Sequence, residues 1–196
     1  MRAPEAVVPA PQPSPAVAGG HAGPARGTLI VCGSHTAAAS AQLAALADAL
    51  AAPIRTISTA AALRDPRAEA RRVAEIARRD LAERGVALVA SERKRLADHG
   101  TLAHGAQIMT AICATVTALR PCLAAVIAKG GITSAQVARD GLGAASAWVV
   151  GPLLPGVAVW EIEASAGTTI SYAVVPGNVG DTRTLVDVAH AFGLLT

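Results

Sequence analysis

Short apolar runs alternate with helical patterns along most of the chain. The segments 28–32, 54–58, 86–90 and 123–128 resemble buried parallel strands, being mainly apolar and bounded by polar or turn-forming residues. Apolar residues at helical spacing, such as Leu43, Leu46 and Leu50, predict helices over 37–51, 66–84 and 106–119. Further strands are expected at 147–150, 156–160 and 169–174, with helices at 135–140 and 182–192. This alternation predicts a three-layer α/β domain with a largely parallel sheet.

Residues 1–26 have a different character from the rest of the chain. They hold many prolines among alanine, valine and glycine and show neither a strand period nor a helix period. We interpret them as a flexible, partly polyproline-like linker, followed by one domain over 27–196. Because a linker joins two parts, we expect the chain to be one half of a larger unit, or a half that works with a separate polypeptide.

The composition of the 196 residues narrows the class of function. With 52% hydrophobic and 16% charged residues, the chain has enough apolar side chain for a core. Only 2% of residues are aromatic, which disfavours a platform for stacked nucleic-acid bases. The net charge of +3 comes from basic and acidic residues interleaved over 64–95, which is typical of a solvated helical face. We therefore expect no nucleic-acid partner.

The sequence also favours a cytoplasmic protein with no membrane partner. The uncharged stretch 141–160 is as long as a membrane span, but Gly151-Pro152 and Pro155-Gly156 predict a strand, a turn and a strand instead. We expect no other hydrophobic segment to reach that length, and the N-terminus lacks the pattern of a secretory signal. Cys32, Cys113 and Cys122 lie in apolar runs without a Cys-x-x-Cys pair, which indicates reduced, buried thiols.

Polar and glycine residues are concentrated at three junctions between a predicted strand and a helix. In a largely parallel sheet, ligands bind at such carboxyl ends of strands. Gly33-Ser34-His35-Thr36 is the first junction; it combines small residues and hydroxyls at a helix start, although Ser34 or Thr36 as a plain helix cap explains it too. The second, 129–134, has the sequence Lys-Gly-Gly-Ile-Thr-Ser and reads either as a ligand loop or as a tight turn.

The third junction, 176–181, has the sequence Pro-Gly-Asn-Val-Gly-Asp, and its Asp181 is more typical of a helix cap than of a ligand contact. His99 and His104 lack the further ligands of a metal site and are interpreted as surface or loop histidines, so no metal ligand is predicted. Together the junctions indicate a cleft for a nucleotide or another phosphorylated ligand. The candidate binding residues are Ser34, Thr36, Lys129, Gly130, Gly131, Ile132, Thr133, Gly177, Asn178 and Gly180.

Four motifs in this order resemble the C-terminal nucleotide-binding domain of the four-carbon acid sugar kinase family. They are Gly33-Ser-His-Thr followed by Gln42, then Lys129-Gly-Gly-Ile-Thr-Ser followed by Gly141-Leu142, then Leu154-Pro-Gly-Val157 followed by Trp160, and last Pro176-Gly-Asn-Val-Gly180. The resemblance spans about 28–196. It departs from the family at Thr36, where serine is usual, and at Val175, where some branches carry lysine.

The resemblance implies ATP binding and phosphoryl transfer to a hydroxyl of a threonate, erythronate or oxo-tetronate type of acid. The family's nucleotide contacts map onto Thr36, Gly130 to Thr133, and Gly177. Mg²⁺ is expected with the nucleotide. The family's N-terminal domain, which binds the sugar acid and supplies the base, is missing from this sequence, so the catalytic residues are unknown. We expect little activity from this chain alone, and pairing with a separate N-terminal half or a homo-oligomer. The alternative is a non-catalytic nucleotide-binding or regulatory module.

Overall fold

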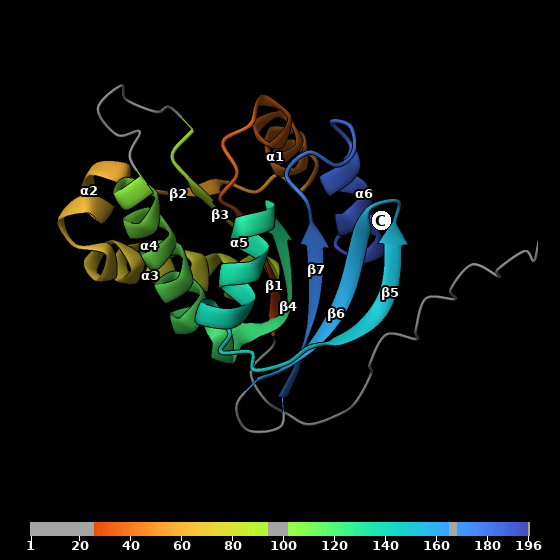
Figure 1. Cartoon of the computed structure of the whole chain (residues 1–196). Helices are drawn as coiled ribbons and strands as arrows, with labels where there is room; N and C mark the ends of the chain where they lie inside the picture. Colours follow the sequence, from red (N-terminus) through yellow and green to blue (C-terminus); the bar gives the residue numbers. More distant parts are fainter. Residues whose placement is uncertain (1–25, 94–101, 165–167, 196) are drawn as a thin grey trace, which may run out of the picture.

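The computed structural model describes residues 26–93, 102–164 and 168–195, so the predicted linker lies almost entirely outside the described residues. Strands and helices alternate through the first two thirds of the domain (Figure 1). The strands are β1 (Gly27–Cys32), β2 (Ile54–Ile57), β3 (Val86–Ser91), β4 (Leu123–Lys129), β5 (Trp148–Leu154), β6 (Val157–Ala164) and β7 (Thr168–Val175). The helices are α1 (Ala37–Ala49), α2 (Thr59–Arg64), α3 (Pro66–Arg84), α4 (Leu102–Leu119), α5 (Gly131–Gln136) and α6 (Thr184–Ala191), with a 3₁₀ turn η2 (Arg120–Cys122) and a π-helical turn η3 (Val137–Gly141).

The strands form one seven-stranded sheet in the order β2-β3-β1-β4-β7-β6-β5. The pairings from β2 to β7 are all parallel, and β6 and β5 extend the sheet in antiparallel fashion. The prediction of an α/β domain with a largely parallel sheet is therefore confirmed. Because β1, β4 and β7 are neighbours, the loops that follow them leave the sheet at the same edge.

Helices cover both faces of the sheet, which makes the three layers. Along β1, Leu29 and Val31 face the core under α3 and α4, while Ile30 and Cys32 face the core under α1 and α6. All four side chains are fully buried, as a central parallel strand requires. Figure 1 shows α3 and α4 on one side of the sheet and α1 and α6 on the other.

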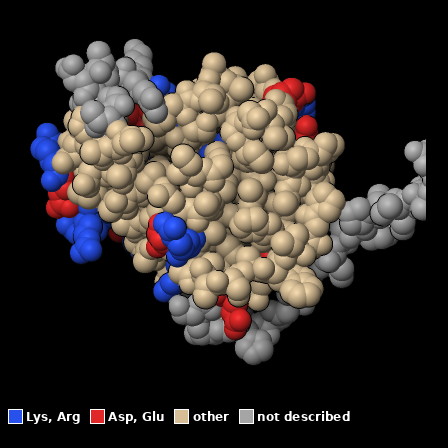
Figure 2. Space-filling view, in the orientation of Figure 1, with Lys and Arg blue, Asp and Glu red and all other residues tan. Residues whose placement is uncertain are grey.

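Local sequence signals account for the best-predicted helices. The carboxylate of Asp65 accepts hydrogen bonds from the N–H groups of Arg67 and Ala68, each at 2.9 Å, and Pro66 opens α3. Gly85 ends this helix in the left-handed conformation, with φ of 71°. Basic and acidic side chains are intermixed on the side of the molecule where α2 and α3 lie, as expected of a solvated face (Figure 1 and Figure 2).

Two local predictions were wrong, and one helix was missed. Helix α2 was not predicted, although Ser58 caps it by accepting a hydrogen bond from the N–H of Ala61. The helix expected from residue 135 begins at Gly131 and passes into η3 after Gln136. Gly151-Pro152 does not make a turn: both residues lie inside β5, where the pairing with β6 is irregular, and the chain reverses only after Leu154.

One helical stretch of the described residues, Leu102–Cys122, is long and apolar enough to span a membrane by length and composition. This corrects the expectation that no hydrophobic segment other than 141–160 reaches that length. In the fold the stretch is a core helix: Ile112, Val116 and Leu119 are fully buried in the core formed with α3 and the sheet. We therefore interpret its apolar character as a requirement of packing.

Candidate functional site

The three predicted junctions meet at the carboxyl edge of the sheet. A Cβ built on Gly177 would lie 3.4 Å from the Ser34 hydroxyl oxygen and 3.9 Å from Cα of Gly130. A Cβ on Gly130 would lie 3.1 Å from the Thr133 hydroxyl oxygen, and one on Gly33 would overlap the same hydroxyl. The first, second and third junctions are thus in direct proximity, and glycines occupy the points of closest approach.

The first junction joins β1 to α1. Thr36 has extended backbone geometry, and its hydroxyl oxygen accepts a hydrogen bond from the N–H of Ala39 at 3.1 Å, so the cap interpretation is confirmed for Thr36. Its side chain is exposed, and its hydroxyl lies 3.4 Å from that of Ser34. The start of a helix of 13 residues is thereby placed at the carboxyl edge of the sheet, where its N–H groups and dipole favour an anion.

The second junction is a sharp turn from β4 into α5. Gly130 has φ of 114°, which side-chain-bearing residues rarely adopt, and Gly131 already lies in the helix. The hydroxyl of Ser134 is buried, and its single O–H is shared between the carbonyls of Ala128 and Gly130, at 2.9 and 2.8 Å, so it stabilises the turn. Thr133 is buried with its hydroxyl near Gly33, whereas 74% of Ile132 is exposed. Ile132 is therefore an exposed apolar side chain next to the turn.

The third junction follows β7. Asn178 and Gly180 are exposed and Gly177 is half-buried. Gly180 has φ of 80°, and a side chain there would collide with Thr184. The carboxylate of Asp181 accepts from the N–H of Arg183 at 2.9 Å. The N-cap residue of α6 is Arg183, without a side-chain cap hydrogen bond, so the prediction of Asp181 as the cap of this helix was wrong.

Lys129 lies behind the third junction and does not face solvent. Its side chain is fully buried, and its ammonium donates to the carbonyls of Pro176 and Val179, at 2.7 and 3.3 Å. Burial lowers the pKa of this ammonium, and the nearby Cys32 opposes that change. The ammonium of Lys129 thus contacts the loop that follows β7.

Two further side chains contact these loops. The amide of Gln42, in α1, donates to the carbonyls of Val179 and Asp181, at 3.1 and 2.6 Å. Arg93 follows β3 and donates to the carbonyls of Ser34 and Cys32, at 2.5 and 3.2 Å. Sequence reasoning assigned Gln42 no role and missed Arg93; the available signal for Arg93 was a basic residue just after a predicted strand.

The cysteines and histidines give no metal centre in the described residues, where no three His, Cys, Asp or Glu side chains are arranged to hold an ion. Cys32 and Cys113 are buried free thiols, as predicted, whereas Cys122 is only partly buried. His99 lies outside the described residues, and His104 lies in α4 and not in a loop.

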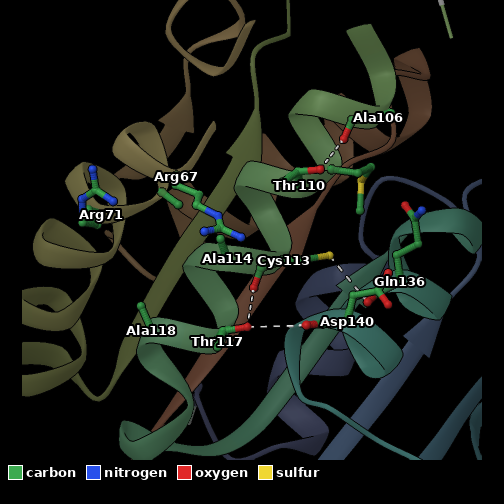
Figure 3. A pocket seen from close by; sticks show the side chains of 12 residues that line it. Arg67, Arg71, Ala106, Thr110, Cys113, Ala114, Thr117, Ala118, Gln136 and Asp140 are labelled. Atoms are coloured by element: carbon green, nitrogen blue, oxygen red, sulfur yellow. Dashed lines mark hydrogen bonds between the residues drawn. The ribbon is translucent and has the colours of Figure 1, made fainter. Parts of the chain in front are cut away.

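A separate groove of about 620 Å³ lies on the helical face between α3, α4 and η3 (Figure 3). Arg67 and Arg71 stand on one side of it and Gln136 and Asp140 on the other, over an alanine-rich floor. The Cys113 thiol donates to the carbonyl of Gln136 at 3.5 Å, and burial raises its pKa to about 11. The lining of this groove includes none of the predicted binding residues, so the carboxyl edge of the sheet is the stronger candidate site.

Comparisons with known proteins identify the family of this chain. A family described as a nucleotide-binding C-terminal domain matches residues 29–185, while no curated protein matches significantly. A Salmonella typhimurium LT2 protein, provisionally named a tRNA synthase, has a similar fold with a TM-score of 0.68 and 21% identity over 84% of this chain and 40% of its own.

Two crystal forms of a Bordetella bronchiseptica protein with a domain of unknown function (DUF1537), each with bound citrate and a domain-swapped dimer, are also similar. One has a TM-score of 0.67 and 20% identity, and the match covers 87% of this chain and 42% of its own. The other has a TM-score of 0.60 and 24% identity, and the match covers 88% of this chain and 40% of its own. The chain therefore spans about two fifths of these solved structures. The family match covers all three junctions at the strand edge, and this chain belongs to the family of nucleotide-binding C-terminal domains.

Proposed function

We propose that the three junctions together bind ATP, and that the chain is the ATP-binding half of a four-carbon acid sugar kinase. The observation that carries the proposal is the convergence of Gly33, Gly130 and Gly177 around the hydroxyls of Ser34 and Thr133. Glycines at the points of closest approach let a phosphate chain come near the backbone, and hydroxyls donate hydrogen bonds to its oxygens.

The surroundings of the three junctions suit a ligand with an aromatic base and a charged tail. The N-terminus of α1 and the turn into α5 supply N–H groups for the phosphates, while the exposed Ile132 offers an apolar surface for the base. Mg²⁺ would accompany the nucleotide, which brings phosphate oxygens as ligands of its own.

Phosphoryl transfer itself requires a second part. The reaction depends on holding the acceptor hydroxyl in line with the terminal phosphate and on a group that takes its proton. This chain spans about 40% of the solved structures it matches, and we propose that a substrate domain supplies the sugar-acid site and the base. One relative forms a domain-swapped dimer, which supports pairing of this half with another chain.

Calorimetric titration with ATP and ADP, with and without Mg²⁺, tests the binding half of the proposal. We expect dissociation constants between micromolar and millimolar for the full chain. A Gly177→Val variant should lose this binding, because its side chain would fill the space between Ser34 and Gly130. Equal affinity in the variant would remove the third junction from the site.

The catalytic half needs a different assay. The chain is mixed with a separately produced N-terminal domain from a complete relative, and phosphorylation of threonate, erythronate and oxo-tetronate is followed with ATP. Phosphate transfer that requires both parts supports the proposed kinase activity. Nucleotide binding with no transfer to any acid favours the alternative, a non-catalytic nucleotide-binding or regulatory module.

A further inference from the structure

We propose that Arg93 and Lys129 are positioning residues for the loops that follow β1 and β7. Each holds its loop by the loop's carbonyl oxygens and so turns loop N–H groups toward the nucleotide phosphates. This inference rests on the proposed ATP site. In this proposal neither side chain contacts the nucleotide itself, so Lys129 has a different role from the direct binding that its sequence position predicted. Their role is to fix the peptide groups that contact the nucleotide and to supply positive charge beneath them.

Lys129 holds the loop after β7. Its ammonium is buried and its hydrogen bonds go to the carbonyls of Pro176 and Val179, which lie at two points of the same turn. Gln42 donates to the carbonyl of Val179 as well, and to that of Asp181. Three carbonyls of one six-residue loop thus face two buried donor groups, which fixes the loop from behind.

Arg93 holds the loop after β1 in the same manner. Its Nη1 donates to the Ser34 carbonyl and to the Cys32 sulfur, and its Nη2 donates to the Cys32 carbonyl and to the Ser91 hydroxyl, at 2.5, 3.7, 3.2 and 2.7 Å. Its Nε donates to the Ser91 carbonyl at 2.9 Å. A guanidinium has five N–H donors, and these bonds account for five. The side chain is therefore committed to the loop and to β3.

The direction of the loop N–H groups follows from peptide geometry. In a trans peptide the C=O and the following N–H point in opposite directions, and the described residues contain no cis peptide. Because the carbonyls of Pro176, Val179 and Ser34 point at a cation, the N–H groups of the next residues point away from it. Two of those next residues are Gly177 and Gly180, which carry no side chain to cover their N–H.

The two side chains also act through their positive charge. Within the described ranges, no carboxylate pairs with Arg93 or Lys129; the ion pairs involve other arginines, such as Arg55 with Asp80 and Arg72 with Glu69. Among the described residues, the positive charges of Arg93 and Lys129 thus lie at the three junctions without a carboxylate partner. Such charges attract a ligand in proportion to its own charge, so they favour ATP over ADP and ADP over AMP.

The test replaces each cation by an uncharged side chain of similar length in the full chain, as Lys129→Met and Arg93→Met. Arg84→Met is the matched control, because Arg84 also donates to a main-chain carbonyl, that of Ala51, but at the opposite edge of the sheet. Calorimetry measures the dissociation constants of ATP, ADP and AMP for each variant. Amide hydrogen exchange measures the opening of 33–36 and 176–181 in the absence of nucleotide.

We expect Lys129→Met and Arg93→Met each to weaken ATP binding at least about tenfold, because one charged hydrogen-bonding group is lost. AMP binding should weaken by a much smaller factor. Exchange should accelerate in 176–181 for Lys129→Met and in 33–36 for Arg93→Met, while Arg84→Met changes neither. The same fold-loss for AMP as for ATP, or unchanged exchange in the loops, overturns the inference. If the unmodified chain binds no nucleotide, the proposed function fails, and loop exchange alone then decides whether the cations hold the loops.

Discussion

Replacing Gly130 by alanine tests whether the turn from β4 into α5 is built as the structure shows. A side chain at φ of 114° costs about 1–3 kcal/mol of backbone strain. The new Cβ would also lie 3.1 Å from the Thr133 hydroxyl oxygen and 3.2 Å from Cβ of Ser34, which adds a packing penalty of about 1 kcal/mol. The two costs together predict a loss of about 2–4 kcal/mol in the free energy of unfolding.

The neighbouring glycine provides the control. A Cβ on Gly131 meets nothing within 4 Å, and its backbone is that of an ordinary helical residue. Gly131→Ala should therefore leave the stability within about 1 kcal/mol of the original. Thermal unfolding followed by circular dichroism measures both, and a domain of this size should lose about 5–15 °C in Tm for Gly130→Ala. An unchanged Tm for Gly130→Ala, or an equal fall for Gly131→Ala, would refute this description of the turn.

Three further predictions concern the site, acid stability and the thiols. Gly177→Val should abolish ATP binding with little effect on Tm, which calorimetry and thermal unfolding on one sample can check; parallel loss of both would point to a folding defect. Backbone hydrogen bonds hold the pKa of Asp65 below its usual value, and hydrogen bonds from Arg72 and Ser58 outweigh burial to lower the pKa of Glu69 as well. The stability that these carboxylates provide above a pH of about 4 should therefore decline as the pH falls further. Urea titrations at pH 7, 4 and 3 test this, and Glu69→Gln should flatten the decline. Iodoacetamide at pH 8 should modify the partly buried Cys122 well before Cys113, whose pKa is raised to about 11, and mass spectrometry of the digest would expose the reverse order.

The parts of the fold that sequence predicts well have a local physical cause. Asp65-Pro66 and Gly85 mark the ends of α3 because a capping carboxylate, a fixed φ and a left-handed glycine each act on their immediate neighbours. The strands near the centre of the sheet are recognisable because burial on both faces demands uninterrupted apolar residues. The three junctions were found for a related reason, since glycines and hydroxyls directly after such strands are visible in the sequence.

The errors arise where distant contacts decide the outcome. Gly131 belongs to a helix because Gly130 alone absorbs the unusual φ, and two adjacent glycines do not reveal which one turns. Gly151-Pro152 remains in β5 because pairing with β6 tolerates an irregular register at that point. The buried position of Lys129 depends on the loop after β7, which lies 47 residues further along the chain. No local pattern distinguishes a lysine that faces a ligand from one that holds a loop.

The central claim is that nucleotide binds between the three junctions, and chemical-shift mapping by NMR on the full chain tests it most directly. With ATP added stepwise in the presence of Mg²⁺, we predict saturable shifts concentrated at 33–36, 130–133 and 177–180. Shifts concentrated instead along the groove between α3 and α4, or an absence of shifts at millimolar ATP, would contradict the account.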